Sequence, residues 1–133
     1  MRIVGIQFSI DWQTVVHYSG HLLVPFLVAL IFFRKDWEKA GLVMLLAIFI
    51  DLDHLLASPI FDPERCSINF HPLHTYWAIA IYFLGLFYKK TRWIATGLIL
   101  HISTDLLDCF WIFQNCHECY IKSAIHDIPF FTN

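Results

Sequence analysis

The stretch WIATGLILHISTDLLDCFWIF, residues 93–113, is apolar along its length except for a few polar side chains at helical spacing. A helix needs about 20 mostly apolar residues to cross a hydrocarbon core of about 30 Å. This stretch has that length, and it follows directly after Arg92. His101, Asp105 and Asp108 lie on one stripe of such a helix, because residues three and four apart are neighbours. The stretch therefore predicts a membrane-spanning helix that carries a polar stripe.

Three further segments have the same apolar character and end at recognisable signals. The first stops at Arg34, the second is closed by Pro59, and the third begins at Pro72, where proline suits the first turn of a helix. With the stretch above they predict four spanning helices, at about residues 14–33, 39–57, 72–88 and 93–113. The expected fold class is all-α, a polytopic membrane protein with a four-helix transmembrane bundle as its single domain, residues 1–133.

The composition of the whole chain favours lipid as its surroundings. Of the 133 residues, 58% are hydrophobic and 15% are charged, and the mean hydropathy is +0.59. A soluble domain has about a quarter of its residues charged. The formal net charge of −2 provides no basic surface for nucleic acid. We therefore expect the lipid bilayer as a partner and no nucleic acid, and the sequence leaves the oligomeric state open.

Positively charged residues concentrate in the two turns that join the expected helices. Six of the nine Lys and Arg residues lie within 34–39 and 89–92. Cytoplasmic loops of membrane proteins carry an excess of these residues. We therefore expect both turns in the cytoplasm, and both termini and the loop 58–71 on the extracytoplasmic side.

Four short polar patterns interrupt the expected helices, each toward the extracytoplasmic side. They are His17-x-x-x-His21, Asp51-x-Asp53-His54, His71-x-x-His74 and His101-x-x-x-Asp105-x-x-Asp108. Each pattern alone has a plain explanation as a hydrogen-bonded core histidine or a polar helix end, but their convergence on one leaflet favours a shared site. The candidate metal ligands are the ten residues His17, His21, Asp51, Asp53, His54, His71, His74, His101, Asp105 and Asp108.

Bound cations would offset the cost of placing these groups in an apolar setting. An Asp at the centre of a membrane helix costs about 2.5–3.5 kcal/mol, and a structural metal ion supplies about 10–16 kcal/mol of apparent binding free energy. Imidazole and carboxylate ligands suit divalent metals, and we expect Zn ahead of Fe or Mn. Because one ion takes about four ligands, ten candidates predict two or more ions.

The patterns together resemble a family of small inner-membrane, metal-dependent hydrolases associated with the bacterial SOS response, or a sister family of bacterial membrane proteins. The matching residues are Gly20-His21-Leu22-Leu23, Asp51-x-Asp53-His54, His71, His74-Thr75 and His101-x-x-x-Asp105. The resemblance implies an inner-membrane location and a metal site of His21, Asp51, Asp53, His54, His71, His74, His101 and Asp105. One departure is the short Pro72-Leu73 spacer between the paired histidines, which is longer in the family.

The expected reaction is hydrolysis of a phosphate ester or lipid-linked substrate at the outer leaflet. Bound ions lower the pKa of a water molecule and polarise a phosphoryl or acyl oxygen. Asp51 or Asp53 would serve as the general base. Arg65, in the loop on the same side, suits a bidentate contact to phosphate, although a solvated loop arginine is the more common explanation.

Two other classes of function fit part of the pattern. A di-iron oxidative enzyme acting on lipids also binds metal through histidine clusters, but its His-x-x-His-His boxes are absent from this sequence. A non-catalytic metal-binding or transport protein would more often show helices broken near the midplane. A haem bundle gains nothing from four Asp residues.

The four cysteines add a prediction about covalent links. Cys66, Cys116 and Cys119 fall on the expected extracytoplasmic side, where disulfides form. Cys66 could pair with either of the other two and tie the loop to the C-terminal segment. Cys109 is expected to be buried in the last helix.

Overall fold

The computed structural model describes residues 11–124, and within that range every regular element is helical. The all-α part of the prediction is therefore confirmed. The elements are α1 (Trp12–Leu22), α2 (Val24–Phe32), α3 (Trp37–Leu45), the 3₁₀ helix η1 (Leu46–Leu56), the short 3₁₀ helix η2 (Pro72–His74), α4 (Tyr76–Gly85), α5 (Arg92–Asn115) and α6 (His117–Lys122).

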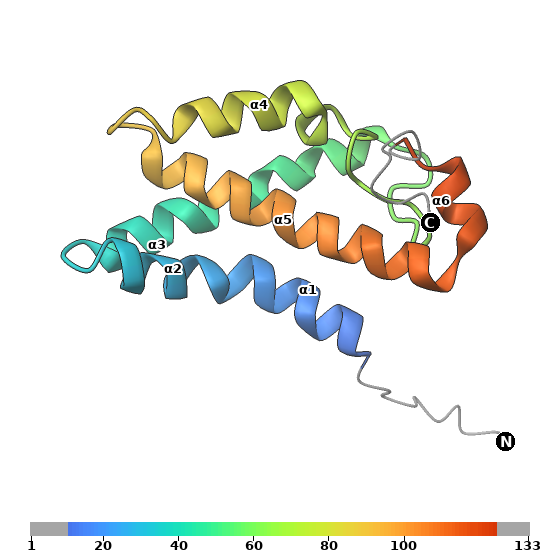
Figure 1. The fold of residues 1–133 in the computed structure, drawn as a ribbon, viewed down its shortest axis with the longest axis horizontal. Helices are drawn as coiled ribbons and strands as arrows, with labels where there is room; N and C mark the ends of the chain where they lie inside the picture. Colours follow the sequence, from blue (N-terminus) through green and yellow to red (C-terminus); the bar gives the residue numbers. More distant parts are fainter. Residues whose placement is uncertain (1–10, 125–133) are drawn as a thin grey trace, which may run out of the picture.

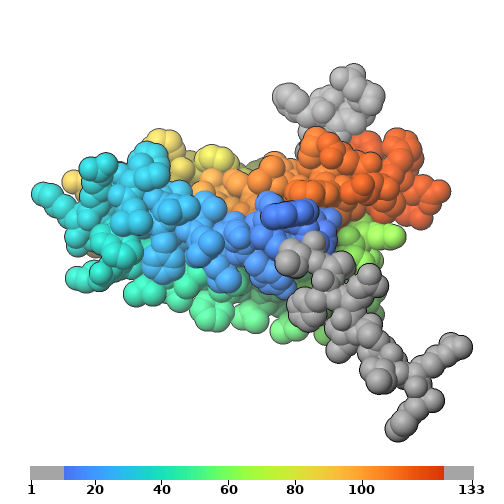
Figure 2. All heavy atoms as spheres, turned by 90° about the horizontal axis from the view of Figure 1, so that it is seen from below, coloured from blue at the N-terminus to red at the C-terminus, as the bar shows by residue number. Residues whose placement is uncertain are grey.

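The helices run side by side as four rods, with α5 packed against the other three (Figure 1). α1 continues into α2, α3 continues into η1, and α4 follows η2. α1 and α2 form the middle of the face seen in Figure 2, between α5 and the rod of α3 and η1. The loop 57–71 and α6 lie together at one end of the bundle, opposite the two tight turns.

Two of the rods are interrupted. α1 and α2 meet at an angle of 42° at Leu23, and Pro25 in the first turn of α2 lacks the N–H that would continue the hydrogen-bond ladder. η1 follows α3 directly at Leu46 and is wound as a 3₁₀ helix, in which residues i and i+3 lie on one side. Asp51 and His54 are such a pair, so this winding aims both side chains the same way.

The prediction of four membrane-spanning helices is wrong. Within residues 11–124, α5 is the one helix long and apolar enough to cross a bilayer, and α1 with α2 would count as a second if the bent pair were a single span. α4 has 10 residues, which extend about 15 Å, half of a hydrocarbon core of about 30 Å. The sequence predicted that this helix begins at Pro72. In the structure Thr75 caps the helix instead, because its hydroxyl accepts a hydrogen bond from the Ala78 N–H.

Small residues allow α5 to lie close against α3. A Cβ atom at Gly97 would meet the backbone of Met44, with the Met44 Cα only 2.6 Å away. Ala29, Ala40 and Met44 form a buried apolar cluster beside this contact. This packing fixes α5 against the rod that ends in η1, and so fixes the relative positions of their polar side chains.

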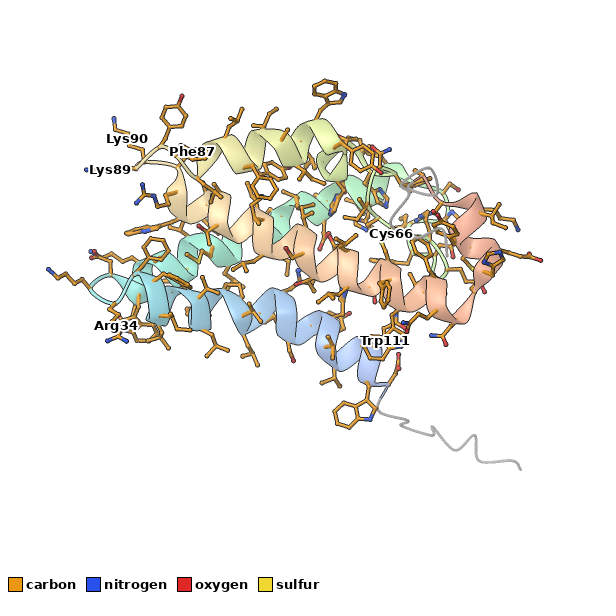
Figure 3. The ribbon with its side chains drawn as sticks, in the orientation of Figure 1. Arg34, Cys66, Phe87, Lys89, Lys90 and Trp111 are labelled. Atoms are coloured by element: carbon orange, nitrogen blue, oxygen red, sulfur yellow. A yellow bond between two sulfur atoms is a disulfide. The ribbon has the colours of Figure 1, made fainter. Side chains whose placement is uncertain are left out.

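The outside of the bundle is strongly apolar. Large side chains such as Phe32, Leu56, Trp77 and Phe87 are 73–83% exposed, and similar residues are exposed on each of α1 to α5. Arg34, Lys89 and Lys90 lie together at one end, and Cys66 lies at the other (Figure 3). A soluble monomer rarely shows apolar surface on this scale.

The expected cysteine pairing is wrong. Cys66 is bonded to Cys109, and Cys116 is bonded to Cys119. Cys109 is buried on α5 one turn beyond Asp105, and the loop folds over that turn. The Cys66–Cys109 disulfide therefore ties the loop to α5 beside the polar stripe, a proximity that sequence spacing alone did not reveal.

Candidate metal centre

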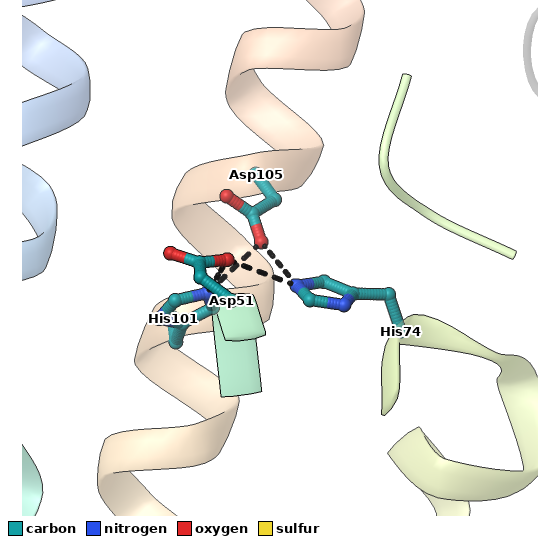
Figure 4. A group of neighbouring side chains, drawn as sticks. All are labelled: Asp51, His74, His101 and Asp105. Carbon is teal, nitrogen blue, oxygen red and sulfur yellow. Dashed lines mark hydrogen bonds and ion pairs between the residues drawn. The ribbon is translucent and has the colours of Figure 1, made fainter. Parts of the chain in front are cut away.

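Four side chains from three elements converge beside α5 and form what we call the central group: Asp51, His74, His101 and Asp105 (Figure 4). Asp105 Oδ2 lies 3.1 Å from His74 Nε2 and 3.3 Å from His101 Nε2. Asp51 Oδ1 lies 3.1 Å from His101 Nε2 and 3.6 Å from His74 Nε2. His74, His101 and Asp105 are buried, and Asp51 is partly exposed.

Local structure places each member of the central group. His101 and Asp105 are one turn apart on α5 and therefore share its inner face. Asp51 comes from the 3₁₀ helix η1. His74 ends η2, and its Nδ1 lies 3.1 Å from Asp53 Oδ2, which also accepts a hydrogen bond from the Leu73 N–H. Asp53 thereby holds the imidazole with Nε2 facing the other three residues.

The second group is His17, His21 and Asp105. His21 Nε2 lies 3.2 Å from Asp105 Oδ1, while Asp105 Oδ2 faces the central group. The rings of His17 and His21 are 4.5 Å apart, as their four-residue spacing on α1 dictates. One carboxylate therefore joins the central and second groups, with one oxygen for each.

The third group is Asp53, His54 and His71, on the loop side of the cluster. His54 Nδ1 lies 3.3 Å from Asp53 Oδ1, and the rings of His54 and His71 stack at 3.8 Å. His54 Nε2 lies 3.2 Å from the hydroxyl of Ser67. Asp53 and His71 are buried, and His54 is nearly so.

These groups hold unpaired polar atoms. In the described part of the chain, seven buried side-chain nitrogen and oxygen atoms make no hydrogen bond, and all seven belong to the three groups: His17 Nδ1, His21 Nδ1 and Nε2, Asp53 Oδ1, His54 Nδ1, His74 Nε2 and Asp105 Oδ2. Their close polar neighbours are ion-pair contacts within the cluster, such as His74 Nε2 with Asp105 Oδ2. An unpaired buried polar group costs about 1–3 kcal/mol. Imidazole nitrogens and carboxylate oxygens that face one another are suitable ligands for a divalent cation. The residues therefore fit a metal ion.

A pocket of about 340 Å³ opens onto the cluster. Asp51 and Asp105 of the central group, His17 of the second, and His54 and His71 of the third line it.

Arg65 and Asp108 also line this pocket. The Arg65 guanidinium donates hydrogen bonds to the carbonyls of Pro59 and Ile60, at 2.8 and 3.0 Å, and lies over the Phe70 ring. Asp108 accepts a 2.7 Å hydrogen bond from Gln13 and lies 4.0 Å from His17 Nδ1.

Nine of the ten predicted ligands fall into groups that could hold a metal ion, and their role as ligands stays a prediction. Asp108 stands at the edge of the cluster, outside these groups. Ser67 and Gln13 were missed by the sequence analysis, because a lone polar residue in a loop or first helical turn gives no signal of the side chain it will contact.

The sequence profile of a family of unknown function (DUF6122) matches residues 11–112, which include all three groups. The chain belongs to this family. Neither a curated protein nor a solved structure matches the chain. The family description names no activity, so the resemblance to inner-membrane hydrolases remains a prediction.

Two histidines near η2 differ in their protonation. Burial lowers the pKa of His74, but the neighbouring carboxylates of Asp105, Asp51 and Asp53 outweigh burial and raise it to about 10. Burial, helped by the nearby His54, lowers the pKa of His71 to about 4. At neutral pH without metal, His74 therefore carries a proton and His71 does not.

We expect metal binding to release a proton. A ligating imidazole must be neutral, so an ion on His74 displaces the proton that the raised pKa keeps there. Because protons compete with the metal below pH 10, the apparent affinity should rise about tenfold per pH unit between pH 6 and 9 for each proton released. Calorimetric titration of Zn²⁺ in two buffers of different ionisation enthalpy measures this release, and a pH-independent affinity would contradict it.

Proposed function

We propose that this protein binds divalent ions at the central and second groups and hydrolyses a phosphate ester by means of a metal-activated water. The observation that carries the proposal is the set of unpaired buried atoms around Asp105. Two of the residues that carry them, His17 and Asp105, line a pocket together with Arg65, a cation suited to a phosphate.

The two groups differ in how many ligands they offer. The central group supplies four residues, and the second supplies His17 and His21 together with the shared Asp105. Three protein ligands leave a coordination position for water in catalytic sites. When bound, divalent ions supply a water of lowered pKa and polarise the oxygen of the substrate. His17 and Asp105 of the second group line the pocket, so an ion held there would border the space where a substrate would lie.

The chain's own residues then take distinct roles. Asp51 Oδ1 faces His74 and His101 and would hold the ion of the central group, whereas the side chain also lines the pocket and is partly exposed, so its other oxygen would accept a proton from a water there. Asp53 is buried and turned toward His74 and Leu73, which suits positioning of an imidazole rather than proton transfer. Arg65 is held by the carbonyls of Pro59 and Ile60, so its guanidinium is oriented before any phosphate arrives.

The test is the hydrolysis of bis(p-nitrophenyl) phosphate and p-nitrophenyl phosphate by the purified, metal-loaded chain. Replacing Asp51 by Asn and His101 by Ala removes two of the four central ligands. We expect turnover to fall at least about 100-fold, with loss of the metal that the central group holds. The matched control, Asp36→Asn with His117→Ala, changes exposed residues away from the cluster. Hydrolysis that survives the Asp51 and His101 double substitution would rule the scheme out.

We also propose an integral membrane location, with the metal centre toward the extracytoplasmic face. The exposed apolar side chains on α1 to α5 and the length of α5 support it. Arg34, Lys89 and Lys90 lie at the end opposite the loop 57–71 (Figure 3). The excess of Lys and Arg in cytoplasmic loops supports a cytoplasmic position for this charged end.

We expect the membrane fraction to retain the protein through an alkaline carbonate wash and to yield it only to detergent. Alkaline carbonate releases proteins that are bound to the membrane surface by charge. A protein whose apolar side chains are buried in lipid stays in the membrane. Immunoblotting of both fractions reads the result, and release into the carbonate supernatant would contradict the proposed location.

A further inference from the structure

We propose that the third group, Asp53, His54 and His71, binds a divalent ion of its own, so that the centre holds three ions around one pocket. The inference rests on the proposed metal centre and deepens it. The ligand atoms of the three side chains lie within 4.8 Å of one another, close enough for one ion to contact all of them.

Asp53 and His54 are each held in place through one side-chain atom, which leaves the second atom of each available to an ion. Asp53 Oδ2 is occupied by the Leu73 N–H and by His74 Nδ1, whereas Asp53 Oδ1 makes no hydrogen bond and has His54 Nδ1, 3.3 Å away, as an ion-pair neighbour. His54 Nε2 lies 3.2 Å from the Ser67 hydroxyl, whereas His54 Nδ1 makes no hydrogen bond and faces the carboxylate oxygens Asp53 Oδ1 and Asp51 Oδ1. Metal-ligating histidines show this arrangement, because the hydrogen bond on the far nitrogen fixes the tautomer that leaves a lone pair for the metal.

The burial of the third group argues for a cation between its members. Asp53 is 5% exposed and His71 is 2% exposed, so a carboxylate oxygen that makes no hydrogen bond lies where water is scarce. Such an oxygen is costly unless a positive charge compensates for it. His71 is held in place by its backbone N–H, which donates to the Ser67 carbonyl, and by its stacking on His54.

The third group adjoins the central group and borders the same pocket. His54 Nδ1 lies 3.6 Å from Asp51 Oδ1 but closer, at 3.3 Å, to Asp53 Oδ1. His54 and His71 both line the pocket with Arg65 and Ser67. An ion here would lie on the loop side and border the pocket that Arg65 also lines. The ion of the third group and the Arg65 guanidinium would together bind oxygens of a phosphoryl group. The other side of that phosphoryl group would face the central and second groups.

The experiment counts metal ions in the whole chain. Purified protein is saturated with Zn²⁺ in detergent at pH 7.5, freed of excess ion by gel filtration, and analysed by elemental mass spectrometry. We expect three ions per chain in the unaltered protein and two in His71→Ala. His71→Asp replaces one ligand type by another and should restore the third ion. The control His117→Ala changes an exposed histidine outside the groups and should keep three.

The outcomes separate this inference from the proposed function. Two ions in the unaltered protein, or three ions that His71→Ala leaves in place, would overturn the third site while leaving hydrolysis at the other groups intact. Three ions that fall to two in His71→Ala, without any phosphate-ester hydrolysis, would support the third site and refute the hydrolase. If His71→Ala fails to fold, the count in the unaltered protein and in His71→Asp decides.

Discussion

Replacing Asp105 by Asn should lower the metal content by two ions per chain and abolish hydrolysis, with a loss of turnover of more than about 10,000-fold, equivalent to about 5.5 kcal/mol. Asp105 Oδ1 faces His21, and Asp105 Oδ2 faces His74 and His101. Asn keeps the volume of the side chain but removes the negative charge that both the central and the second group share. Elemental analysis and phosphate-ester turnover measure the two effects.

Asp36 offers the matched control for this substitution. It is an exposed carboxylate at the opposite end of the bundle, in the turn between α2 and α3. Asp36→Asn changes the net charge by the same amount and should leave metal content and turnover unchanged. An Asp105→Asn protein that kept both ions would show that the carboxylate does not join the two groups.

Removal of metal by a chelator should lower the melting temperature of the protein by more than about 10 °C. A ligand at 1,000 times its dissociation constant stabilises the folded state by about 4 kcal/mol, and each kcal/mol shifts the melting temperature by several degrees in a domain of this size. Without metal the unpaired atoms of the three groups remain buried. Thermal unfolding in detergent, followed by circular dichroism with and without EDTA, measures the shift.

The Asp105→Asn variant provides the internal control for chelation. Since it is expected to lack two of the ions, EDTA should shift its melting temperature much less than that of the unaltered protein. If EDTA leaves the melting temperature of the unaltered protein unchanged, the cluster is stable as a set of ion pairs between His and Asp. The metal proposal would then fail.

The candidate site was predicted from sequence more completely than the fold. Helical spacing placed His17 with His21, and His101 with Asp105, on single helix faces, and up-down connectivity brought these pairs to one end of the bundle. Spacing could not assign different positions to neighbouring carboxylates. Asp53 lies beside Asp51 in the sequence, yet Asp51 lines the pocket and Asp53 turns away to hold His74.

The number of spanning helices and the disulfide pairing were the main errors. Hydropathy counts apolar residues. It cannot register that Pro25 lies where one rod bends, that the chain winds as a 3₁₀ helix from Leu46, or that α4 begins only after Thr75. Cys109 was assigned to a buried position without a partner, because the fold of the loop over α5 depends on contacts between residues far apart in the chain.

The sequence by itself determined the all-helical class, the positions of the apolar segments and the residues able to bind a cation. These properties are local: they follow from composition, helical periodicity and side-chain chemistry within a turn or two. Only the tertiary structure decided which oxygen of Asp105 faces which group, how Asp53 divides its two oxygens, and which groups border the pocket with Arg65. These depend on the packing of α5 against the other rods and on the loop held by Cys66, where shifts of an ångström change which atoms can share a cation.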